Sequence, residues 1–384
     1  MKKGYKQTEI GFIPEDWKID RIRNLAVITT GSRNTQDRID TGQYPFFVRS
    51  QKVERINTYS FDGEAVLTAG DGVGTGKVFH YIKGKFDFHQ RVYKISDFNE
   101  NIDGFFFFLY FSNAFLKRIM SMTAKSSVDS VRMEMIANML IPLPPKDEQI
   151  AIAKAVFDVT TFIESLNELI EKKKNIKQGA MQELLTGKKR LPGFTDELVI
   201  ERLDELAFIN MGQSPDSHYY NEKGLGLPLI QGNADIEARR SVQRIWTTQI
   251  TKTCDEGDLI LTVRAPVGSV GIATKRSCIG RGVCALKPNG TDRLYLYQLL
   301  IFSENGWKKL EQGSTFTSAN SSQIGGFELS ITKSRSEQTT IAQFLTDMDS
   351  EVNALERKRD KYKLLKVGLM QQLLTGRIRL KCKN

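Results

Sequence analysis

Residues 148–191 read EQIAIAKAVFDVTTFIESLNELIEKKKNIKQGAMQELLTGKKRL, and residues 337–380 read EQTTIAQFLTDMDSEVNALERKRDKYKLLKVGLMQQLLTGRIRL. The two segments align without a gap at an offset of 189 residues, and 18 of their 44 positions are identical. Self-similarity at a fixed offset is the signature of a repeated structural unit. The sequence therefore predicts a chain that is built twice from one plan.

Both segments have the pattern of a long amphipathic helix. Apolar residues recur at alternating steps of four and three, the heptad spacing of a coiled-coil seam. The seam positions are Ile152, Val156, Val159, Ile163, Leu166 and Ile170 in the first segment, and Ile341, Leu345, Met348, Val352 and Leu355, then Arg359 and Tyr362, in the second. Each segment ends at the glycine of LLTG, a typical helix stop. About 40 residues at a rise of 1.5 Å each give a helix of about 60 Å.

Two apolar seams in one chain most simply bury each other. We therefore expect the two helices to form an antiparallel intramolecular coiled coil. The alternative is that each seam pairs with a second molecule, in which case the isolated chain is a homodimer.

The segments that precede the two helices also resemble each other. WKIDRIRNLAVITTGS (residues 17–32) resembles LVIERLDELAFINMGQ (198–213), and GEAVLTAGDGVGTGKV (63–78) resembles GDLILTVRAPVGSVGI (257–272). Short strand-like runs with glycine-rich turns dominate both segments. The predicted fold class is α+β, with two similar mixed α/β domains (residues 1–146 and 192–336), two helices (147–191 and 337–384) and an approximate internal two-fold axis.

Composition and charge limit the function classes. The chain of 384 residues has a net charge of +10, which favours a polyanionic partner. Residues 1–146 carry 21 basic and 16 acidic side chains (net +5), whereas residues 192–336 carry 16 of each (net zero). We expect DELVIERLDEL (196–206) to be an acidic helix, so the second domain can bind DNA only if its arginines segregate from it.

Targeting and redox patterns point to the cytoplasm. The longest apolar block, FFFFLYF (105–111), is expected to be buried, no run is long enough to span a membrane, and the N-terminal residues lack the apolar core of a signal peptide. The four cysteines have neither CxxC spacing nor neighbouring histidines, which argues against zinc and disulfides. We expect a reducing cytoplasmic location and no membrane partner.

The order of segments identifies a family. YKQTEIGFIPEDWKI (5–19), IPLPPKDEQIAIAKAV (141–156) and LLTGKKRL (184–191) resemble the specificity subunit of type I restriction–modification systems, and the resemblance covers the whole chain. It implies two target-recognition domains, each of which reads one half of a split site in double-stranded DNA, and helices that set the spacing. ELSITKSRSEQ (328–338) departs from the pattern because it lacks prolines, which is expected to loosen that domain–helix junction.

The same resemblance implies the partners. In this family the helices dock two methyltransferase subunits, and restriction subunits join that core. It also implies a noncatalytic chain that holds no cofactor, with S-adenosylmethionine bound by the methyltransferase partner.

No catalytic motif is complete in the sequence. GDGVGTGKV (70–78) fails as a phosphate loop because Asp71 stands where a glycine is required and Val78 follows Lys77 in place of Ser or Thr. We therefore predict a glycine-rich turn between two strands. IPLPPK (141–146) lacks the motif of an amino-methyltransferase, and the three histidines are scattered.

Polar loop residues are the candidates for DNA contacts, because arginine suits the edge of guanine and asparagine or glutamine that of adenine. In the first domain they are Arg33, Asn34, Arg49, Ser50, Gln51, Lys52, Lys77, His89, Gln90, Arg91, Lys125, Ser126 and Ser127. In the second domain they are Gln213, Ser214, Gln231, Asn233, Arg239, Arg240, Arg264, Arg281, Thr315, Thr317, Ser318 and Asn320. The alternative function is a coiled-coil scaffold for protein assembly without DNA binding, which leaves the two glycine-turn domains unexplained.

A helix insertion tests the role of the helices as a spacer. Four residues added to one helix lengthen it by about 6 Å, which is one to two base-pair rises of about 3.4 Å each. The preferred gap between the two half-sites should change while both half-sites stay the same, as measured by mapping methylated positions in the genome. A change in the half-sites themselves would contradict the spacer model.

Overall fold

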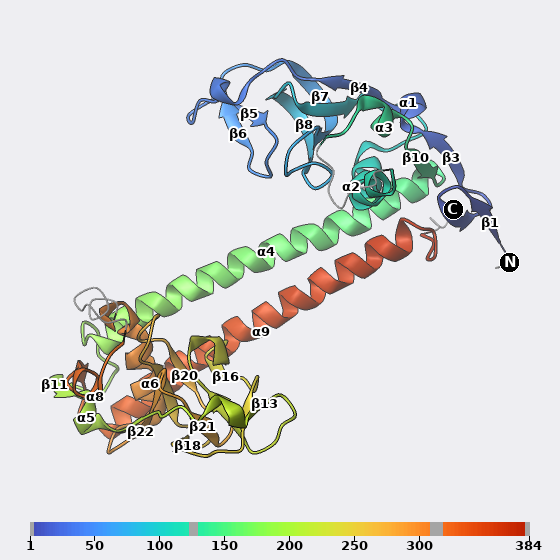
Figure 1. Ribbon diagram of the computed structural model, residues 1–384. Coiled ribbons are helices and arrows are strands. Elements are labelled where there is room, and N and C mark those ends of the chain that lie inside the picture. The colour runs from blue at the N-terminus through green and yellow to red at the C-terminus, as the bar shows by residue number, and fades with distance from the viewer. Residues whose placement is uncertain (1–3, 123–129, 308–317, 381–384) are drawn as a thin grey trace. The chain divides into compact units, whose positions relative to one another are not determined.

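The computed structural model describes residues 4–122, 130–307 and 318–380 (Figure 1). The chain forms two compact units, of which the first comprises residues 1–166 and 358–384 and the second residues 167–357. Each unit contains one mixed α/β domain, one end of helix α4 (Lys146–Leu185) and one end of helix α9 (Arg335–Leu373). The predicted fold class, two similar domains separated by two long helices, is confirmed.

The domain of the first unit is built on a six-stranded sheet with the order β4-β9-β7-β8-β5-β6. Its strands are β4 (Val27–Thr30), β5 (Tyr44–Phe47), β6 (Glu54–Ile56), β7 (Phe61–Ala69), β8 (Phe79–Phe88) and β9 (Val92–Ser96). Two ribbons pair β1 (Tyr5–Thr8) with β2 (Gly11–Pro14) and β3 (Lys18–Arg21) with β10 (Leu140–Leu143). The helices are α1 (Ile22–Leu25), η1 (Thr35–Asp37), α2 (Gly104–Ser121) and α3 (Met133–Ala137). The phenylalanines of α2 fill the core as expected, with Phe106, Phe107, Phe111 and Phe115 fully buried.

The domain of the second unit divides the same kind of framework into two sheets. A six-stranded sheet has the order β12-β22-β19-β20-β16-β15, and a five-stranded sheet has the order β13-β17-β14-β21-β18. Their strands are β12 (Ala207–Met211), β13 (Tyr220–Asn221), β14 (Leu227–Ile230), β15 (Ile236–Glu237), β16 (Arg240–Ser241), β17 (Trp246–Thr247), β18 (Thr253–Cys254), β19 (Leu259–Thr262), β20 (Val270–Ile272), β21 (Ser277–Ile279) and β22 (Val283–Pro288). The remaining elements are α5 (Leu203–Leu206), η2 (Ser217–Tyr219), η3 (Asn233–Asp235), α6 (Arg293–Phe302), α8 (Ser321–Gly325) and a ribbon of β11 (Val199–Arg202) with β23 (Glu328–Ile331).

The two domains share their strand registers. β5 runs parallel to β8 with Phe47 opposite Phe88, just as β14 runs parallel to β21 with Ile230 opposite Ile279. β4 pairs with β9 as β12 pairs with β22. The repeat seen in the helical segments therefore extends through both domains.

One expectation for the second domain is wrong. Residues 196–206 are not a helix, because β11 pairs with β23 and only the single turn of α5 follows it. Partly buried residues alternate with exposed ones along β11, which is the period of a strand with one buried face. Pairing with a strand more than 120 residues away overrides the helical propensity of this segment.

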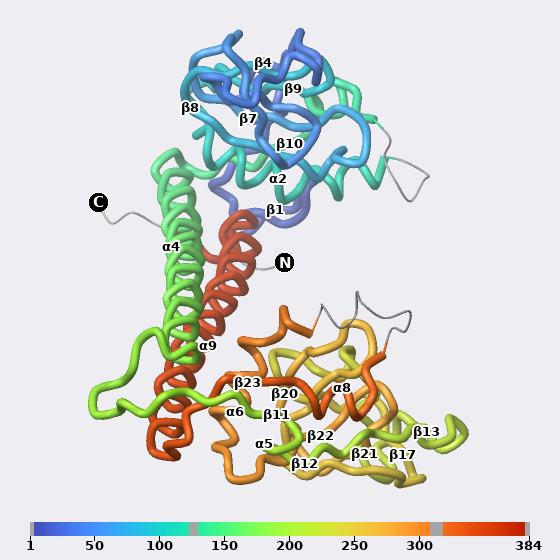
Figure 2. The backbone as a smooth tube through the Cα atoms, turned by 90° about the vertical axis from the view of Figure 1, so that its left-hand side faces the viewer, coloured from blue at the N-terminus to red at the C-terminus, as the bar shows by residue number. Residues whose placement is uncertain are grey.

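Helices α4 and α9 pack against each other in antiparallel fashion within one chain (Figure 2). In the first unit the ring of Phe162 lies edge-on to that of Tyr362, with their centroids 4.6 Å apart. In the second unit Lys177 pairs with Asp349 at 2.6 Å. Most of the predicted seam is buried, including Ile152, Val156, Ile163, Leu166, Ile170, Ile341, Leu345 and Val352. The intramolecular coiled coil is confirmed in both units.

Each domain is joined to its helix by the same glutamine. The Gln149 Oε1 accepts a hydrogen bond from the backbone N–H of Asp103, and the Gln338 Oε1 accepts one from Asp292, both at 2.8 Å. The two aspartates cap α2 and α6. The Gln338 side chain also donates to the Thr332 carbonyl, as the Gln149 side chain does to that of Pro144. The second junction therefore keeps the contacts of the first without the prolines.

The chain turns sharply where each helix ends. Gly187 and Gly376, the glycines of the two LLTG motifs, have φ values of +71° and +65°, in the left-handed region that favours glycine. The turns lead to two equivalent arginines, Arg190 and Arg379. These arginines make the ion pairs that close the two units.

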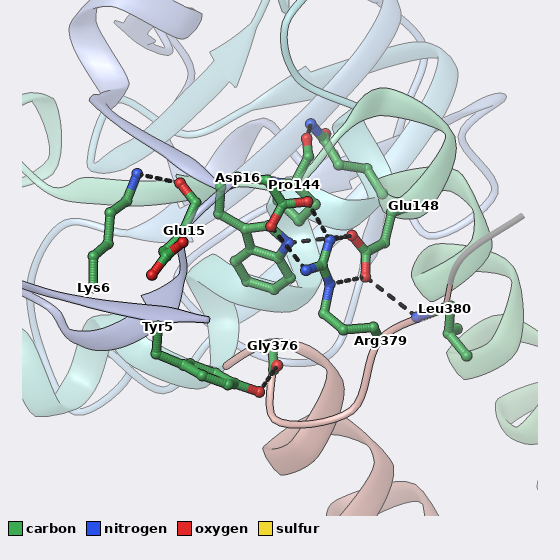
Figure 3. A network of polar contacts seen from close by, with 11 residues as sticks. Tyr5, Lys6, Glu15, Asp16, Pro144, Glu148, Gly376, Arg379 and Leu380 are labelled. Atoms are coloured by element: carbon green, nitrogen blue, oxygen red, sulfur yellow. Dashed lines mark hydrogen bonds and ion pairs between the residues drawn. The ribbon is translucent and has the colours of Figure 1, made fainter. Parts of the chain in front are cut away.

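In the first unit Arg379 binds two carboxylates (Figure 3). Its guanidinium donates to both oxygens of Glu148 at 2.8 and 2.7 Å and to both oxygens of Asp16 at 2.8 and 2.6 Å. Trp17 Nε1 donates to Glu148 at 3.2 Å, and the backbone N–H of Leu380 donates to the same carboxylate. We call the Arg379–Glu148 contact the first clamp.

In the second unit Arg190 binds Glu337 through the same two-pronged geometry, with contacts of 2.8 and 2.5 Å. We call this contact the second clamp. The Glu337 side chain is only 1% exposed. Burial opposes its ionisation, but hydrogen bonds from Arg190 and Thr332 and the charge of Arg190 outweigh burial and leave the pKa of Glu337 lowered. Both clamps join the end of one repeat to the start of the other.

Among the described residues, no helix is both long and apolar enough to cross a membrane.

Removing the first clamp should destabilise the first unit. Arg379→Ala leaves the Glu148 carboxylate, which is only 5% exposed, without its cation. Breaking a buried pair by removing one partner costs about 3–5 kcal/mol. The measurement is the free energy of unfolding from urea titration, and Arg377→Ala, an exposed arginine two residues away, is the matched control. Equal losses for the two variants would contradict a stabilising role of the clamp.

Acid should weaken the second clamp. Because the folded pKa of Glu337 is lowered below its ordinary value of 4.5, its contribution is present above that value and is lost as the pH falls through the folded pKa. Glu337→Gln should lower the free energy of unfolding at pH 7. Its further loss between pH 5 and pH 3 should be smaller than that of the wild type. Parallel pH profiles for the two proteins would show that this carboxylate does not carry the effect.

Candidate nucleic-acid interface

Four loops of the first unit contact one another. They follow β4 (residues 31–37), β5 (48–53) and β7 (70–78) and precede β9 (89–91), and we call them the first loop cluster. The Gln90 Nε2 donates to Asn34 Oδ1 at 2.6 Å, and the backbone N–H of His89 donates to the Phe47 carbonyl at 2.9 Å. Loops that lie far apart in the sequence therefore form one polar surface.

Charged side chains connect three of these loops. Arg49 donates to one carboxylate oxygen of Asp71 at 2.8 Å, and Arg91 lies 3.3 Å from the other oxygen. His89 is buried beneath them and accepts a hydrogen bond from the backbone N–H of Arg91. Burial, followed by the positive charge of Arg49, lowers the pKa of His89. The imidazole is therefore biased toward its neutral form and supports the loop that carries Arg91.

Other predicted residues of the first cluster have different environments. The Arg33 guanidinium lies 3.2 Å from Asp87, which is fully buried and also accepts from Thr58 and Ser60. The exposed members of the predicted set are Arg49, Ser50, Gln51, Lys52, Lys77, Gln90 and Arg91. The glycine-rich segment around Lys77 is the turn between β7 and β8, as the sequence predicted.

The second unit assembles equivalent loops, which we call the second loop cluster. They comprise residues 212–216, 231–235, 263–269, 280–282 and 318–320. The backbone N–H of Arg281 donates to Ser214 Oγ at 3.1 Å, and Arg264 forms a β-bridge with Ser318. The exposed predicted residues here are Gln213, Asn233, Arg264, Arg281, Ser318 and Asn320, and Ser214 and Gln231 are half-buried.

Close backbone approach requires glycine at the same place in both clusters. A Cβ on Gly31 would lie 2.0 Å from the Phe88 carbonyl oxygen, and a Cβ on Gly212 would lie 2.2 Å from that of Gly280. Neither contact can be relieved by moving a flexible side chain, because the opposing atoms are backbone. In the first unit, Gly31 lets the loop after β4 approach the segment that precedes β9. In the second unit, Gly212 lets the loop after β12 approach the segment that precedes β22.

Two predicted arginines lie away from the second cluster. Arg239 binds both oxygens of Glu304, and Arg240 is exposed beside it. Both line a cavity of about 800 Å³ together with residues of α4, α6 and α9. The remaining predicted residues, Lys125, Ser126, Ser127, Thr315 and Thr317, lie outside the described part of the chain.

The first cluster also contains an acidic residue, Asp71, that is not among the predicted contacts. Asp71 was noted only as a mismatch in a phosphate-loop motif, yet it binds two of the predicted arginines. An acidic residue is not expected in a surface that meets DNA. The sequence offered only one signal, the position of Asp71 between two glycines in a predicted turn.

Each of the two units matches one known family of protein domains. The model of the type I restriction modification DNA specificity domain matches residues 14–177 and again residues 196–363. The chain belongs to the type I restriction–modification DNA specificity family. A relative from Methanocaldococcus jannaschii, assigned as the type I restriction enzyme MjaX specificity subunit, is 30% identical over 99% of this chain and 98% of its own length. The MjaVIII specificity subunit of the same organism is 23% identical over 97% of this chain and 95% of its own length.

Solved structures show the same fold. The specificity subunit of a type I system from M. genitalium aligns over 100% of both chains with a TM-score of 0.70 and 16% identity. A chain from a study of complex assembly in a type I system aligns over 95% of this chain and 99% of its own with a TM-score of 0.59 and 23% identity.

The family of this chain also indicates whether it catalyses a reaction. This is a noncatalytic subunit whose role is DNA sequence recognition in a restriction–modification complex. A scaffold without DNA binding does not account for two matches to a DNA specificity domain, one in each unit.

Proposed function

We propose that each loop cluster reads one half of a split DNA site and that the two half-sites differ in sequence. The observation that carries this proposal is the equivalent position of the two clusters on one shared framework. Framework strands keep their register, whereas the side chains on the loops differ from one unit to the other. Two domains with the same strands and different polar loop residues are suited to reading two different DNA sequences.

The chemistry of the loops fits direct readout of base edges. Arg49 and Arg91 in the first cluster and Arg264 and Arg281 in the second are exposed and can donate paired hydrogen bonds to guanine. Gln90 and Asn233 are exposed amides of the kind that pair with adenine. Lys52 and Lys77 are exposed cations suited to phosphate. We also propose the other predicted residues as DNA contacts, including Arg239 and Arg240, which lie outside the two loop clusters.

The helices complete the proposed assembly. α4 and α9 set the spacing between the half-sites, and their outer faces dock two methyltransferase subunits, to which restriction subunits add. The methyltransferases bind S-adenosylmethionine and supply further phosphate contacts, because residues 192–336 carry no net charge of their own. We place the complex in the cytoplasm, where its DNA substrate lies.

Single arginine substitutions test the assignment of half-sites. The site is first obtained by mapping methylated positions in the genome. Affinity is then measured by fluorescence anisotropy on the full-length chain in its methyltransferase complex. Arg264→Ala should weaken binding to the intact site by about 5- to 150-fold. It should have little further effect on a duplex in which the half-site read by the second unit is scrambled, and wild-type binding should weaken as salt rises.

Arg276→Ala is the matched control for this experiment. Arg276 is an exposed arginine of the same domain that follows β20, at the end of the sheet opposite Arg264. Its removal should leave the affinity for the site unchanged. Equal effects of the two substitutions would mean that net charge, and not contact by the second loop cluster, determines binding. Absence of salt-dependent binding by the wild-type complex would overturn the proposed function.

A further inference from the structure

The first loop cluster contains an aspartate that no DNA-binding role explains by itself. Asp71 is bound by Arg49 from the loop after β5 and by Arg91 from the loop before β9, at 2.8 and 3.3 Å. The arginine side chains are 45% and 63% exposed, whereas that of Asp71 is 20% exposed. The carboxylate therefore lies behind two guanidinium groups that face solvent. We call these three residues the first triplet.

A carboxylate at this place has a cost and a benefit. It repels nearby phosphates, so it lowers the general attraction of the surface for DNA. It also holds two long side chains in defined orientations, which reduces the conformational entropy lost when they bind. Orientation matters for arginine because its planar fork makes two hydrogen bonds only when it is aligned with its acceptors. The expected balance is weaker nonspecific binding and sharper base selection.

The repeat identifies the equivalent residues in the second unit. The bond from the Gly70 N–H to the Arg91 carbonyl, at 2.8 Å, corresponds to the bond from the Val263 N–H to the Gly282 carbonyl, at 2.9 Å. These bonds place Gly282 at the position of Arg91. The β-bridge of Asp71 with Ser130 corresponds to the bridge of Arg264 with Ser318. Arg264 therefore stands where the first unit has Asp71.

The third position follows from the parallel strand pairs. The His89 N–H donates to the Phe47 carbonyl at 2.9 Å, and the Gly280 N–H donates to the Ile230 carbonyl at 2.8 Å. Two residues beyond Phe47 is Arg49, and two residues beyond Ile230 is Gly232. The second triplet is therefore Gly232, Arg264 and Gly282.

The three positions differ together between the units. Where the central residue is an aspartate, both neighbours are arginines, and where it is an arginine, both neighbours are glycines. Each triplet carries a net charge of +1, from two arginines and one aspartate or from one arginine. Replacing Asp71 alone by arginine would place three arginines together in the first unit. Replacing Arg264 alone by aspartate would leave that aspartate without a neighbouring arginine in the second triplet. The net charge of the triplet is therefore the same in both units, although all three residues differ.

We propose that Asp71 is a positioning residue that aligns Arg49 and Arg91 for paired hydrogen bonds to guanine, and that the triplet is a coupled specificity element in each domain. The proposal rests on the proposed function, because it assumes that the loop clusters meet base edges. It adds that the first unit presents two arginines held in place by an aspartate. At the same positions the second unit presents one arginine between two glycines. The half-site of the first unit is accordingly selected at more than one guanine.

Asp71→Asn tests this proposal. If Asp71 only stabilises the fold, its loss should weaken binding to every duplex, whereas loss of a positioning residue should weaken binding to the mapped site alone. The variant removes a negative charge, so binding of the complex to a duplex without the site should stay equal or become tighter. Binding to the mapped site should weaken, which lowers the specific-to-nonspecific ratio about tenfold or more. Asp62→Asn is the matched control, an exposed aspartate at the opposite end of the same strand, β7. It should leave the ratio unchanged.

Two further variants keep the test decisive if Asp71→Asn folds poorly. Asp71→Glu keeps the carboxylate and should retain most of the ratio. The exchange R49G/D71R/R91G, which installs the second triplet in the first unit, should abolish selection at the first half-site and leave the second intact. An unchanged ratio in Asp71→Asn, equal losses in the Asn and Glu variants, or retained selection at the first half-site in the triple exchange would overturn the proposal. Failure of the wild-type complex to select the mapped site would instead refute the proposed function.

Discussion

Two buried carboxylates, Glu148 and Glu337, hold the helices and the domain of each unit together. Each is bound by an arginine from the end of the other repeat. A heptad seam alone tolerates a slip of seven residues, because the same apolar pattern recurs after each slip. A slip would separate a carboxylate from its arginine and leave a buried charge without a partner, which is far more costly than a shifted apolar contact. The clamps therefore select one register for α4 and α9 in each unit.

The clamps also connect the helices to the domains. Glu148 and Glu337 are followed at once by Gln149 and Gln338, whose side chains bind the N-terminal caps of α2 and α6. One short segment thus binds the opposite repeat through its glutamate and its own domain through its glutamine. The loop clusters stand on sheets that pack against those helices. Precision at the DNA-facing loops depends on this chain of polar contacts as well as on the apolar core.

The division between framework and loops explains why the two domains diverged where they did. Gly31 and Gly212 are both required because a Cβ at either position would strike backbone. The triplets, in contrast, differ completely while their backbone hydrogen bonds are the same. A frame that depends on backbone pairing and on glycine leaves the exposed side chains free to vary. The fold therefore depends on the backbone pairing, whereas the choice of DNA sequence depends on the loop side chains.

The amino-acid sequence was enough to predict the doubled plan, the two helices, their seam and the loops that carry the polar residues, because these depend on local periodicity and on turn chemistry. It could not show that residues 196–206 form a strand and a single helical turn, because β11 exists only through its pairing with β23. Nor could it show that Asp71 joins Arg49 to Arg91, since that contact links three loops that are far apart in the sequence. Which charges meet is visible only in the folded chain, because ion pairs between distant loops leave no period in the sequence.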